Sequence, residues 1–365
     1  MASDASTEDS SGPKLAENTP IVDTDIHVIS GLKDEDVARY LDEPYKSWLL
    51  NPRNGLGRER DPYMGGKIEQ RGIDGPTQLR KELVGEMHID NPIINPFARL
   101  SNYHQTDLAT ALMQGYNKAL IDLYLDELDD FYGMIELAPQ EPDKAAEEID
   151  KYADNDQIVG AWILSSGPQP PLGDPTYDVM YQAAEDNGLA IAYHGAGPGA
   201  FPREFPKQDL GLERMMSVHT VAHPWNQMLT LTSLLVQGAP VKFPDLNFAF
   251  LEAGISWVPY LMFRLNKEHA MRRSEAPLLE KTPEEHIRDS FYFSSQPLGE
   301  PNNQQHMQDL ISILGPENIM FASDYPHWDF DHPEGMDKHL RTTFSSEERD
   351  QVLHKTASEV FGLKV

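Results

Sequence analysis

The stretch Ile319-Met320-Phe321-Ala322-Ser323-Asp324 decides the fold that we expect of this chain. It is an apolar run that ends on a carboxylate, which is typical of a buried strand whose last residue faces an active site. Two further runs, Ile21–His27 and Leu189–His194, also end on residue types that bind metals. Residues two apart on a strand point to one side, and the carboxyl ends of barrel strands meet at one face. Four side chains are therefore predicted to converge: Asp25, His27, His194 and Asp324.

Short apolar, β-branched runs alternate with helical patterns along the chain, which is typical of βα units around a parallel sheet. The expected strands are 21–27, 92–95, 132–137, 158–165, 189–194, 246–252, 291–296 and 319–324. Helical spacing or helix-end signals mark 106–128, 142–153, 177–186, 214–237, 257–273 and 345–361. A length of 365 residues fits either one large barrel or two ordinary domains, and the strand pattern favours the barrel. We therefore predict an α/β fold, a single-domain (β/α)8 TIM barrel over residues 21–365.

Two segments do not fit a minimal barrel. Residues 1–20 are rich in Ser, Asp, Glu and Thr, so we expect a disordered acidic tail rather than a signal or an anchor. Residues 51–85 form a long insertion between the first and second strands, rich in Gly, Arg, Pro and charge. A connection of this kind is either a lid over the catalytic face or an exposed loop. The sequence favours neither.

Composition limits the partners of the chain. The formal charge of −29, from 59 acidic and 30 basic residues, argues against nucleic acid and anionic membranes and leaves a small molecule as the expected partner. Such an acidic excess keeps a protein hydrated in high salt, so we infer a halophilic source as a hypothesis. We expect a cytoplasmic protein, because no segment approaches the roughly 20 apolar residues that cross a bilayer. There is no cysteine, so a metal must be bound through His, Asp or Glu.

The four predicted ligands suit a divalent ion. A centre of two imidazoles and two carboxylates leaves a position for water, lowers the pKa of that water and polarises a substrate oxygen. Asp324 can orient or deprotonate the water. Each residue taken alone is also explained as an ordinary polar residue at a strand end. Their placement on separate strand ends of one predicted face favours the metal site.

Further polar side chains are candidates for the reaction. Glu252 ends the sixth expected strand and is a general base, a buried acid or a structural carboxylate. His219 and His223 lie four apart on one helix face, and we favour pocket lining over ligation because Pro224 interrupts the turn. We take Asp324, Glu252 and His223 as the catalytic candidates.

A second group is predicted to contact the substrate. The alternative role is packing beneath the loop after the eighth strand for the aromatic residues and solvated charge for the arginine. His327 is expected either to contact a metal ligand on the side away from the metal or to face the substrate. The candidates are His219, Tyr325, His327, Trp328 and Arg99.

Several segments together resemble the amidohydrolase superfamily, specifically the amidohydrolase-related branch that includes aminocarboxymuconate-semialdehyde decarboxylase. They occur in the family's order and span nearly the whole expected barrel. The matching segments are Val22-Asp23-Thr24-Asp25-Ile26-His27, Ala138-Pro139-Gln140-Glu141-Pro142, Ala192-Tyr193-His194-Gly195-Ala196-Gly197, Phe243-Pro244-Asp245-Leu246, Phe250-Leu251-Glu252-Ala253-Gly254-Ile255-Ser256-Trp257-Val258-Pro259 and Ala322-Ser323-Asp324-Tyr325-Pro326-His327-Trp328-Asp329.

The resemblance implies a distorted (β/α)8 barrel with one or two divalent metals at the carboxyl ends of the strands, and often a homodimer. It assigns Asp25, His27, His194 and Asp324 as ligands. Relatives often carry histidine at the position of Asp25. A carboxylate at this position shifts the metal preference of the site from zinc toward manganese or magnesium. Some relatives bridge two metals with a carbamylated lysine after the fourth strand, which lacks lysine here. We therefore expect one divalent ion, zinc or manganese.

The reaction expected first is hydrolysis of an ester, lactone or amide of a small organic acid by metal-activated water. The alternative is non-oxidative decarboxylation of an aromatic or unsaturated carboxylic acid. Decarboxylase relatives typically end the sixth strand in histidine, whereas this chain has Glu252, which favours hydrolysis. A non-catalytic barrel used for binding is the third hypothesis, because fold does not fix function.

Overall fold

The computed structural model describes residues 19–28, 31–50, 73, 75–96, 98–195, 215–342 and 344–364. Most of the expected acidic tail, and residues 51–72 and 74 of the expected insertion, lie outside these ranges. The described end of the insertion is helical: α3 (Pro76–Arg80) continues into a π-helical turn, Lys81–Glu86. Leu79 and Leu83 on this segment are buried, so it belongs to the core of the fold. The lid hypothesis stays a prediction.

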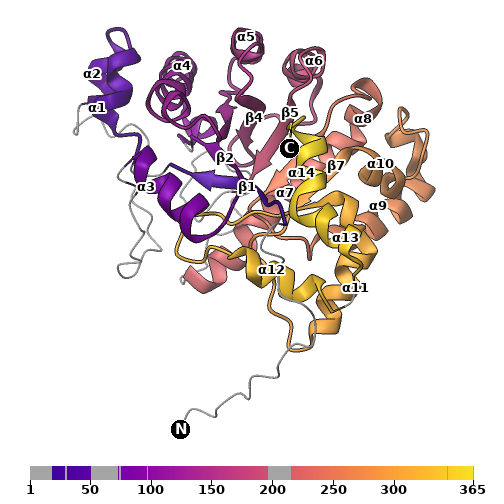
Figure 1. Ribbon diagram of the computed structural model, residues 1–365. Coiled ribbons are helices and arrows are strands. Elements are labelled where there is room, and N and C mark those ends of the chain that lie inside the picture. Colours follow the sequence, from indigo (N-terminus) through magenta and orange to yellow (C-terminus); the bar gives the residue numbers. More distant parts are fainter. Residues whose placement is uncertain are drawn as a thin grey trace.

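The described chain contains all eight expected strands, and they form one parallel sheet in sequence order (Figure 1). The observed strands are shorter than expected at some ends, above all the last. They are β1 (Val22–His27), β2 (Asn91–Asn95), β3 (Tyr132–Glu136), β4 (Ile158–Leu164), β5 (Ala190–His194), β6 (Phe248–Leu251), β7 (Phe291–Ser294) and β8 (Ile319–Met320).

The barrel closes between its last and first strands. The Thr24 amide donates to the Phe321 carbonyl at 3.2 Å, and the Asp324 amide donates to the Asp25 carbonyl at 2.9 Å. The His27 amide donates to the Tyr325 carbonyl at 2.8 Å. Backbone pairing thus continues past the short β8 and holds the strand-one and strand-eight ligands side by side.

Helices cover the outside of the sheet (Figure 1). The long segments expected as helices are helical, and two capping boxes, Thr282 with Glu285 and Ser345 with Glu348, mark helix starts. The helices are α1 (Asp34–Val37), α2 (Tyr45–Leu50), α3, α4 (Thr106–Leu123), α5 (Pro142–Tyr152), α6 (Asp178–Asp186), α7 (Met215–Val236), α8 (Ala239–Lys242), α9 (Val258–Arg272), α10 (Pro283–Ser290), α11 (Gln304–Leu314), α12 (Pro333–Leu340), α13 (Ser346–Asp350) and α14 (Thr356–Val360).

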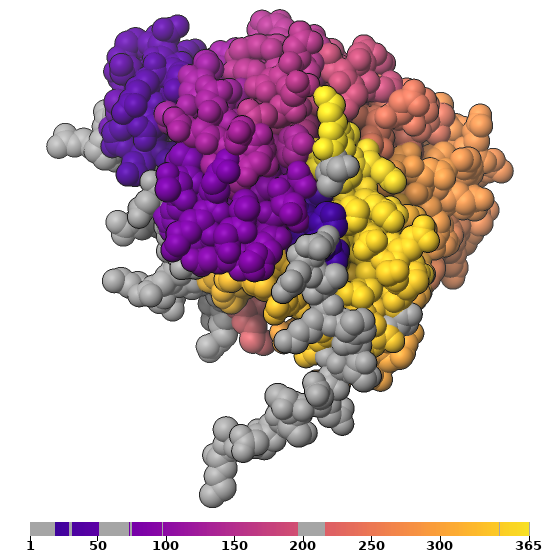
Figure 2. Space-filling model, viewed as in Figure 1, coloured from indigo at the N-terminus to yellow at the C-terminus, as the bar shows by residue number. Residues whose placement is uncertain are grey.

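The two ends of the described chain meet on one side of the molecule. A π-helical turn, Gln351–Lys355, joins α13 to α14, and both this turn and α14 pack against β1 and β8. Figure 2 shows the yellow C-terminal segment beside the indigo and violet N-terminal one. Residues separated by most of the sequence therefore stabilise each other.

Side chains that alternate along the strands divide the core into two layers. Small residues such as Ala190, Ala192 and Ala249 line one cluster together with Trp162. The larger cluster, with Tyr193, Phe248 and Phe250 among its members, lies between the strands and the helices. His194 follows Ala190 and Ala192 at spacing two, so it faces the same side as these small residues, and its ring centroid lies 4.8 Å from that of Trp162. This layering positions the site.

Candidate metal centre

The four predicted ligands come together at the carboxyl end of the barrel. Asp25 and His27 lie on β1, His194 ends β5, and Asp324 follows β8. All four side chains are buried. The Nε2 atoms of His27 and His194 are 3.3 Å apart, and His27 Nε2 is 3.0 Å from Asp324 Oδ1. His194 Nε2 lies 3.4 Å from Asp25 Oδ2.

These spacings fit one cation. Metal–ligand bonds of about 2.1 Å place neighbouring ligand atoms about 3.0 Å apart in octahedral geometry and about 3.4 Å apart in tetrahedral geometry. The donor atoms quoted above are 3.0 to 3.4 Å apart, and a fourth pair, His27 Nε2 and Asp25 Oδ1, is at 3.5 Å. The ligand atoms of Asp25, His27 and His194 are therefore close enough to hold one divalent ion, and Asp324 and His327 form a second such group with His27.

Neighbouring groups orient the ligands. His194 Nδ1 lies 2.6 Å from the Gly195 carbonyl, which directs Nε2 toward the centre. The side-chain amide of Asn95 donates to Asp25 Oδ1 at 2.5 Å, and that of Gln296 donates to Asp324 Oδ2 at 3.1 Å. Each carboxylate thus has one oxygen fixed by an amide.

Sequence reasoning missed both amides. Asn95 ends β2, and Gln296 follows β7 by two residues. The same signal that identified the ligands, a polar residue at the end of an apolar run, also marks both amides. The amides were passed over because only residue types that commonly bind metals were considered. The structure therefore adds the ends of β2 and β7 to the three strand ends, of β1, β5 and β8, where sequence placed the ligands.

Glu252 and His223 form a second part of the site. Glu252 follows β6 in the left-handed region, with φ of 51°, and Asp324 has φ of 62°. Left-handed backbone in a residue other than glycine is strained and is concentrated at functional sites. Glu252 Oε1 is 3.3 Å from His223 Nε2, and Glu252 Oε2 is 3.1 Å from His194 Nδ1. Glu252 therefore links an imidazole of α7 to a ligand of the centre.

The expected interruption at Pro224 is wrong, because α7 runs from Met215 to Val236 with this proline inside. Tertiary contacts compensate for the lost backbone bond. Gln227, one turn further on, donates through Nε2 to the carbonyls of Tyr193 and Leu251, each at 2.9 Å. These bonds fix α7 to the ends of β5 and β6 and bring His223 to Glu252.

The remaining candidates line the rim or pack below it. His327 Nδ1 is 2.5 Å from Asp324 Oδ1, and the His327 ring centroid lies 4.9 Å from that of His27. The His219 ring lies 5.6 Å from the ring of Trp328, which is half exposed. Tyr325 is buried with its ring against Phe330, which matches the packing alternative.

Arg99 is exposed on the connection after β2. Its positive charge still affects the centre, because it contributes to lowering the pKa of His27, where burial is the largest cause and the charges of His327 and His194 follow. The arginine therefore lies within electrostatic range of the ligands.

The charged side chains of the centre shift one another's pKa values. Burial by itself lowers the pKa of His194, but Glu252 and Asp25 outweigh it and raise that pKa to about 9. Burial, Glu252 and Asp25 raise the pKa of Asp324 well above its ordinary value. Burial alone would raise the pKa of Glu252, but His223 and His194 hold it well below the usual range. Without a cation, protons thus occupy places in the cluster that a metal would take.

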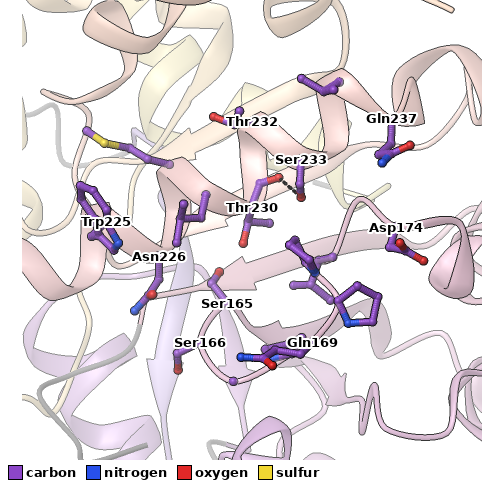
Figure 3. A pocket seen from close by; sticks show the side chains of 18 of the residues that line it. Ser165, Ser166, Gln169, Asp174, Trp225, Asn226, Thr230, Thr232, Ser233 and Gln237 are labelled. Atoms are coloured by element: carbon purple, nitrogen blue, oxygen red, sulfur yellow. Dashed lines mark hydrogen bonds between the residues drawn. The ribbon is translucent and has the colours of Figure 1, made fainter. Parts of the chain in front are cut away.

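A separate hollow of about 790 Å³ lies between α7 and the segment that follows β4 (Figure 3). Its labelled residues include Ser166 and Gln169 on that segment and Asn226 and Thr230 on α7. None of the four ligands lines it.

Comparison with known proteins identifies the family. A family model described as amidohydrolase matches residues 97–363, well over half of the chain. The chain belongs to the amidohydrolase family. The superfamily expected from the sequence is thereby confirmed. Searching curated protein sequences gives no significant match.

Solved amidohydrolase-type structures share the fold along nearly the whole chain. An amidohydrolase from Mycobacterium avium subsp. paratuberculosis is 17% identical over 95% of this chain and 100% of its own, with a TM-score of 0.73. 2,6-Dihydroxybenzoate decarboxylase from Rhizobium is 16% identical over 95% and 100%, with a TM-score of 0.69.

A third similar structure is 5-carboxyvanillate decarboxylase from Novosphingobium aromaticivorans, in complex with manganese and 4-hydroxy-3-methoxy-5-nitrobenzoic acid. It is 18% identical over 98% of this chain and 100% of its own, with a TM-score of 0.70. Among the residues that the structure describes, none of the helices is long and apolar enough to cross a membrane.

Proposed function

We propose that this chain is a metal-dependent decarboxylase of a small aromatic or unsaturated carboxylic acid. The observation that carries the proposal is the 3.3 Å contact between His223 Nε2 and Glu252 Oε1. In the sequence, Glu252 replaces the histidine of decarboxylase relatives, and this replacement favoured hydrolysis. Helix α7 supplies an imidazole from another direction, so the centre has the proton donor that decarboxylation requires.

The ligand set suits a hard divalent cation, and we propose Mn²⁺, because two of the four side chains are carboxylates. Asp25, His27, His194 and Asp324 would hold it. When bound, the cation stabilises negative charge on substrate oxygen. The manganese in the decarboxylase from Novosphingobium aromaticivorans supports the same choice.

Proton delivery belongs to His223 in this proposal. Glu252 Oε1 lies 3.3 Å from His223 Nε2, where it can accept a hydrogen bond from that nitrogen and orient the ring. As the bond between the ring carbon and the carboxyl group breaks, its electron pair stays on the ring carbon, which takes the proton from His223. Carbon dioxide leaves, and Arg99 would contact the substrate carboxylate before the reaction.

The test is carbon dioxide release from a panel of aromatic acids that includes 5-carboxyvanillate and 2,6-dihydroxybenzoate. The protein is treated with chelator and reloaded with Mn²⁺ or Zn²⁺, and Asp324→Asn is the inactive control. We expect metal-dependent release from at least one acid. Cleavage of esters, lactones or amides, with no carbon dioxide from any acid, would overturn the proposal.

Hydrolysis remains the second candidate because of one further contact. His327 Nδ1 is 2.5 Å from Asp324 Oδ1, so this pair can accept a proton from water and keep it. Metal-dependent cleavage of a lactone panel by the same preparations tests it. Loss of that cleavage in His327→Asn, with carbon dioxide release unchanged, would assign His327 to hydrolysis alone.

A further inference from the structure

One buried carboxylate holds the backbone on both sides of Arg99. Glu136 is the last residue of β3 and is fully buried. Its Oε2 accepts a hydrogen bond from the Ala98 amide at 2.5 Å, and its Oε1 accepts one from the Leu100 amide at 2.6 Å. Both oxygens of one side chain thus bind the two amides that flank the arginine.

The backbone of Arg99 itself is in the left-handed region, with φ of 59° and ψ of 44°. A residue other than glycine adopts this conformation only where its surroundings impose it. In that conformation the neighbouring amides point to one side and form a concave anion site, which the Glu136 carboxylate occupies. The Glu136 contacts therefore explain why an arginine can hold this backbone.

Other contacts immobilise the same connection. Asn117 of α4 exchanges two hydrogen bonds with the backbone of Glu136, at 2.8 and 3.0 Å. Gln140 donates to the Leu100 carbonyl at 2.7 Å, and Ser101 donates through Oγ to the Leu164 carbonyl at 3.2 Å. The turn at residues 98–100 is therefore built on three strands and a helix.

This turn belongs to the rim of the metal centre. Four residues before Arg99, Asn95 donates to the ligand Asp25. The charge of Arg99 acts on His27, and Glu136 is within electrostatic range of both His194 and Arg99. A fixed backbone thus carries a cation within electrostatic range of the predicted ligand His27, in a chain of net charge −29.

We propose that Glu136 is a positioning residue that fixes the backbone of Arg99 so that its guanidinium receives the carboxylate of the substrate. This inference rests on the proposed function, because it takes an organic acid as the substrate. It assigns Glu136 no contact with the substrate. Its effect on substrate binding passes through Arg99 alone.

The test measures binding of 4-hydroxy-3-methoxy-5-nitrobenzoic acid and of its methyl ester to the manganese-loaded protein. Arg99→Met should weaken binding of the acid about ten- to a hundredfold and leave binding of the ester unchanged, because only the acid offers a charged partner. Glu136→Gln should weaken binding of the acid about tenfold, since glutamine keeps only one acceptor oxygen. Glu82→Gln, at a buried glutamate of the Lys81–Glu86 turn that accepts a hydrogen bond from Gln78, is the matched control.

The double variant separates positioning from general loosening. In an Arg99→Gly background, glycine adopts positive φ without strain and no guanidinium is present, so adding Glu136→Gln should not weaken acid binding further. Additive losses in the double variant, or equal losses for acid and ester, would overturn the proposal.

A second measurement does not depend on the substrate class. Hydrogen exchange of the peptide that contains residues 98–100 should speed up in Glu136→Gln and not in Glu82→Gln. If the wild-type protein binds neither the acid nor the ester, the proposed substrate class is wrong. If hydrogen exchange at residues 98–100 is also unchanged in Glu136→Gln, the positioning role of Glu136 is wrong as well. Faster exchange would support the backbone contact on its own.

Discussion

Binding of the cation should release a proton and should therefore strengthen steeply with pH. Without metal, burial lowers the pKa of His194, but Glu252 and Asp25 outweigh it and raise the value to about 9. Ligation through Nε2 requires the neutral ring. The protonated ring competes with the metal at every pH below that value. Affinity should thus rise with pH and level off near 9.

The size of the effect follows from the pKa. At pH 7, two units below about 9, only about 1% of His194 is neutral in the metal-free protein. Protonation then weakens metal binding about a hundredfold, or about 2.7 kcal/mol. Each pH unit should change the apparent affinity about tenfold, and more where Asp324, whose pKa is also raised, releases a second proton.

The assay is calorimetric titration of metal-free protein with Mn²⁺ between about pH 6.5 and 8.5, in two buffers of different ionisation enthalpy. Proton release of at least one per metal is expected at neutral pH. Glu252→Gln removes the strongest attraction for the His194 proton, so its slope should flatten at neutral pH. His306→Gln, at an exposed histidine of α11, should behave as wild type. Metal affinity independent of pH, with no proton release, would refute the reasoning.

Four further results are expected. Replacing His223 by Asn should lower kcat for decarboxylation by about 10²- to 10⁴-fold with metal content unchanged, and an unaltered kcat would exclude it as the proton donor. Gln296→Leu removes the donor to Asp324 Oδ2, so metal affinity by calorimetry should fall about 10- to 100-fold. At Gly195 an added Cβ would lie 2.3 Å from the Glu252 carbonyl oxygen. Gly195→Ala should therefore lower the free energy of unfolding by about 1–3 kcal/mol in denaturant titrations, and an unchanged unfolding midpoint would contradict the contact. Because self-repulsion at a net charge of −29 is screened by salt, the thermal midpoint should rise with KCl, and maximal stability and activity in low-salt buffer would count against a halophilic source.

The sequence by itself determined the strands and placed the predicted ligands at their ends. Strand periodicity is local, so the runs ending at His27 and His194, and the run before Asp324, could be identified from their own residues. A parallel barrel brings all carboxyl strand ends to one face by its topology. Convergence of the four ligands therefore required no knowledge of packing.

Only the tertiary structure decided which side chains serve those ligands. Gln296 reaches Asp324, Glu136 binds the turn around Arg99, and His223 reaches Glu252 because Gln227 fixes α7 to the ends of β5 and β6. These contacts join residues 24 to 38 positions apart in the chain. Their partners depend on how helices and loops pack over the barrel, and no local pattern encodes that packing. The contact between His223 and Glu252, on which the proposed proton donor rests, was consequently found only in three dimensions.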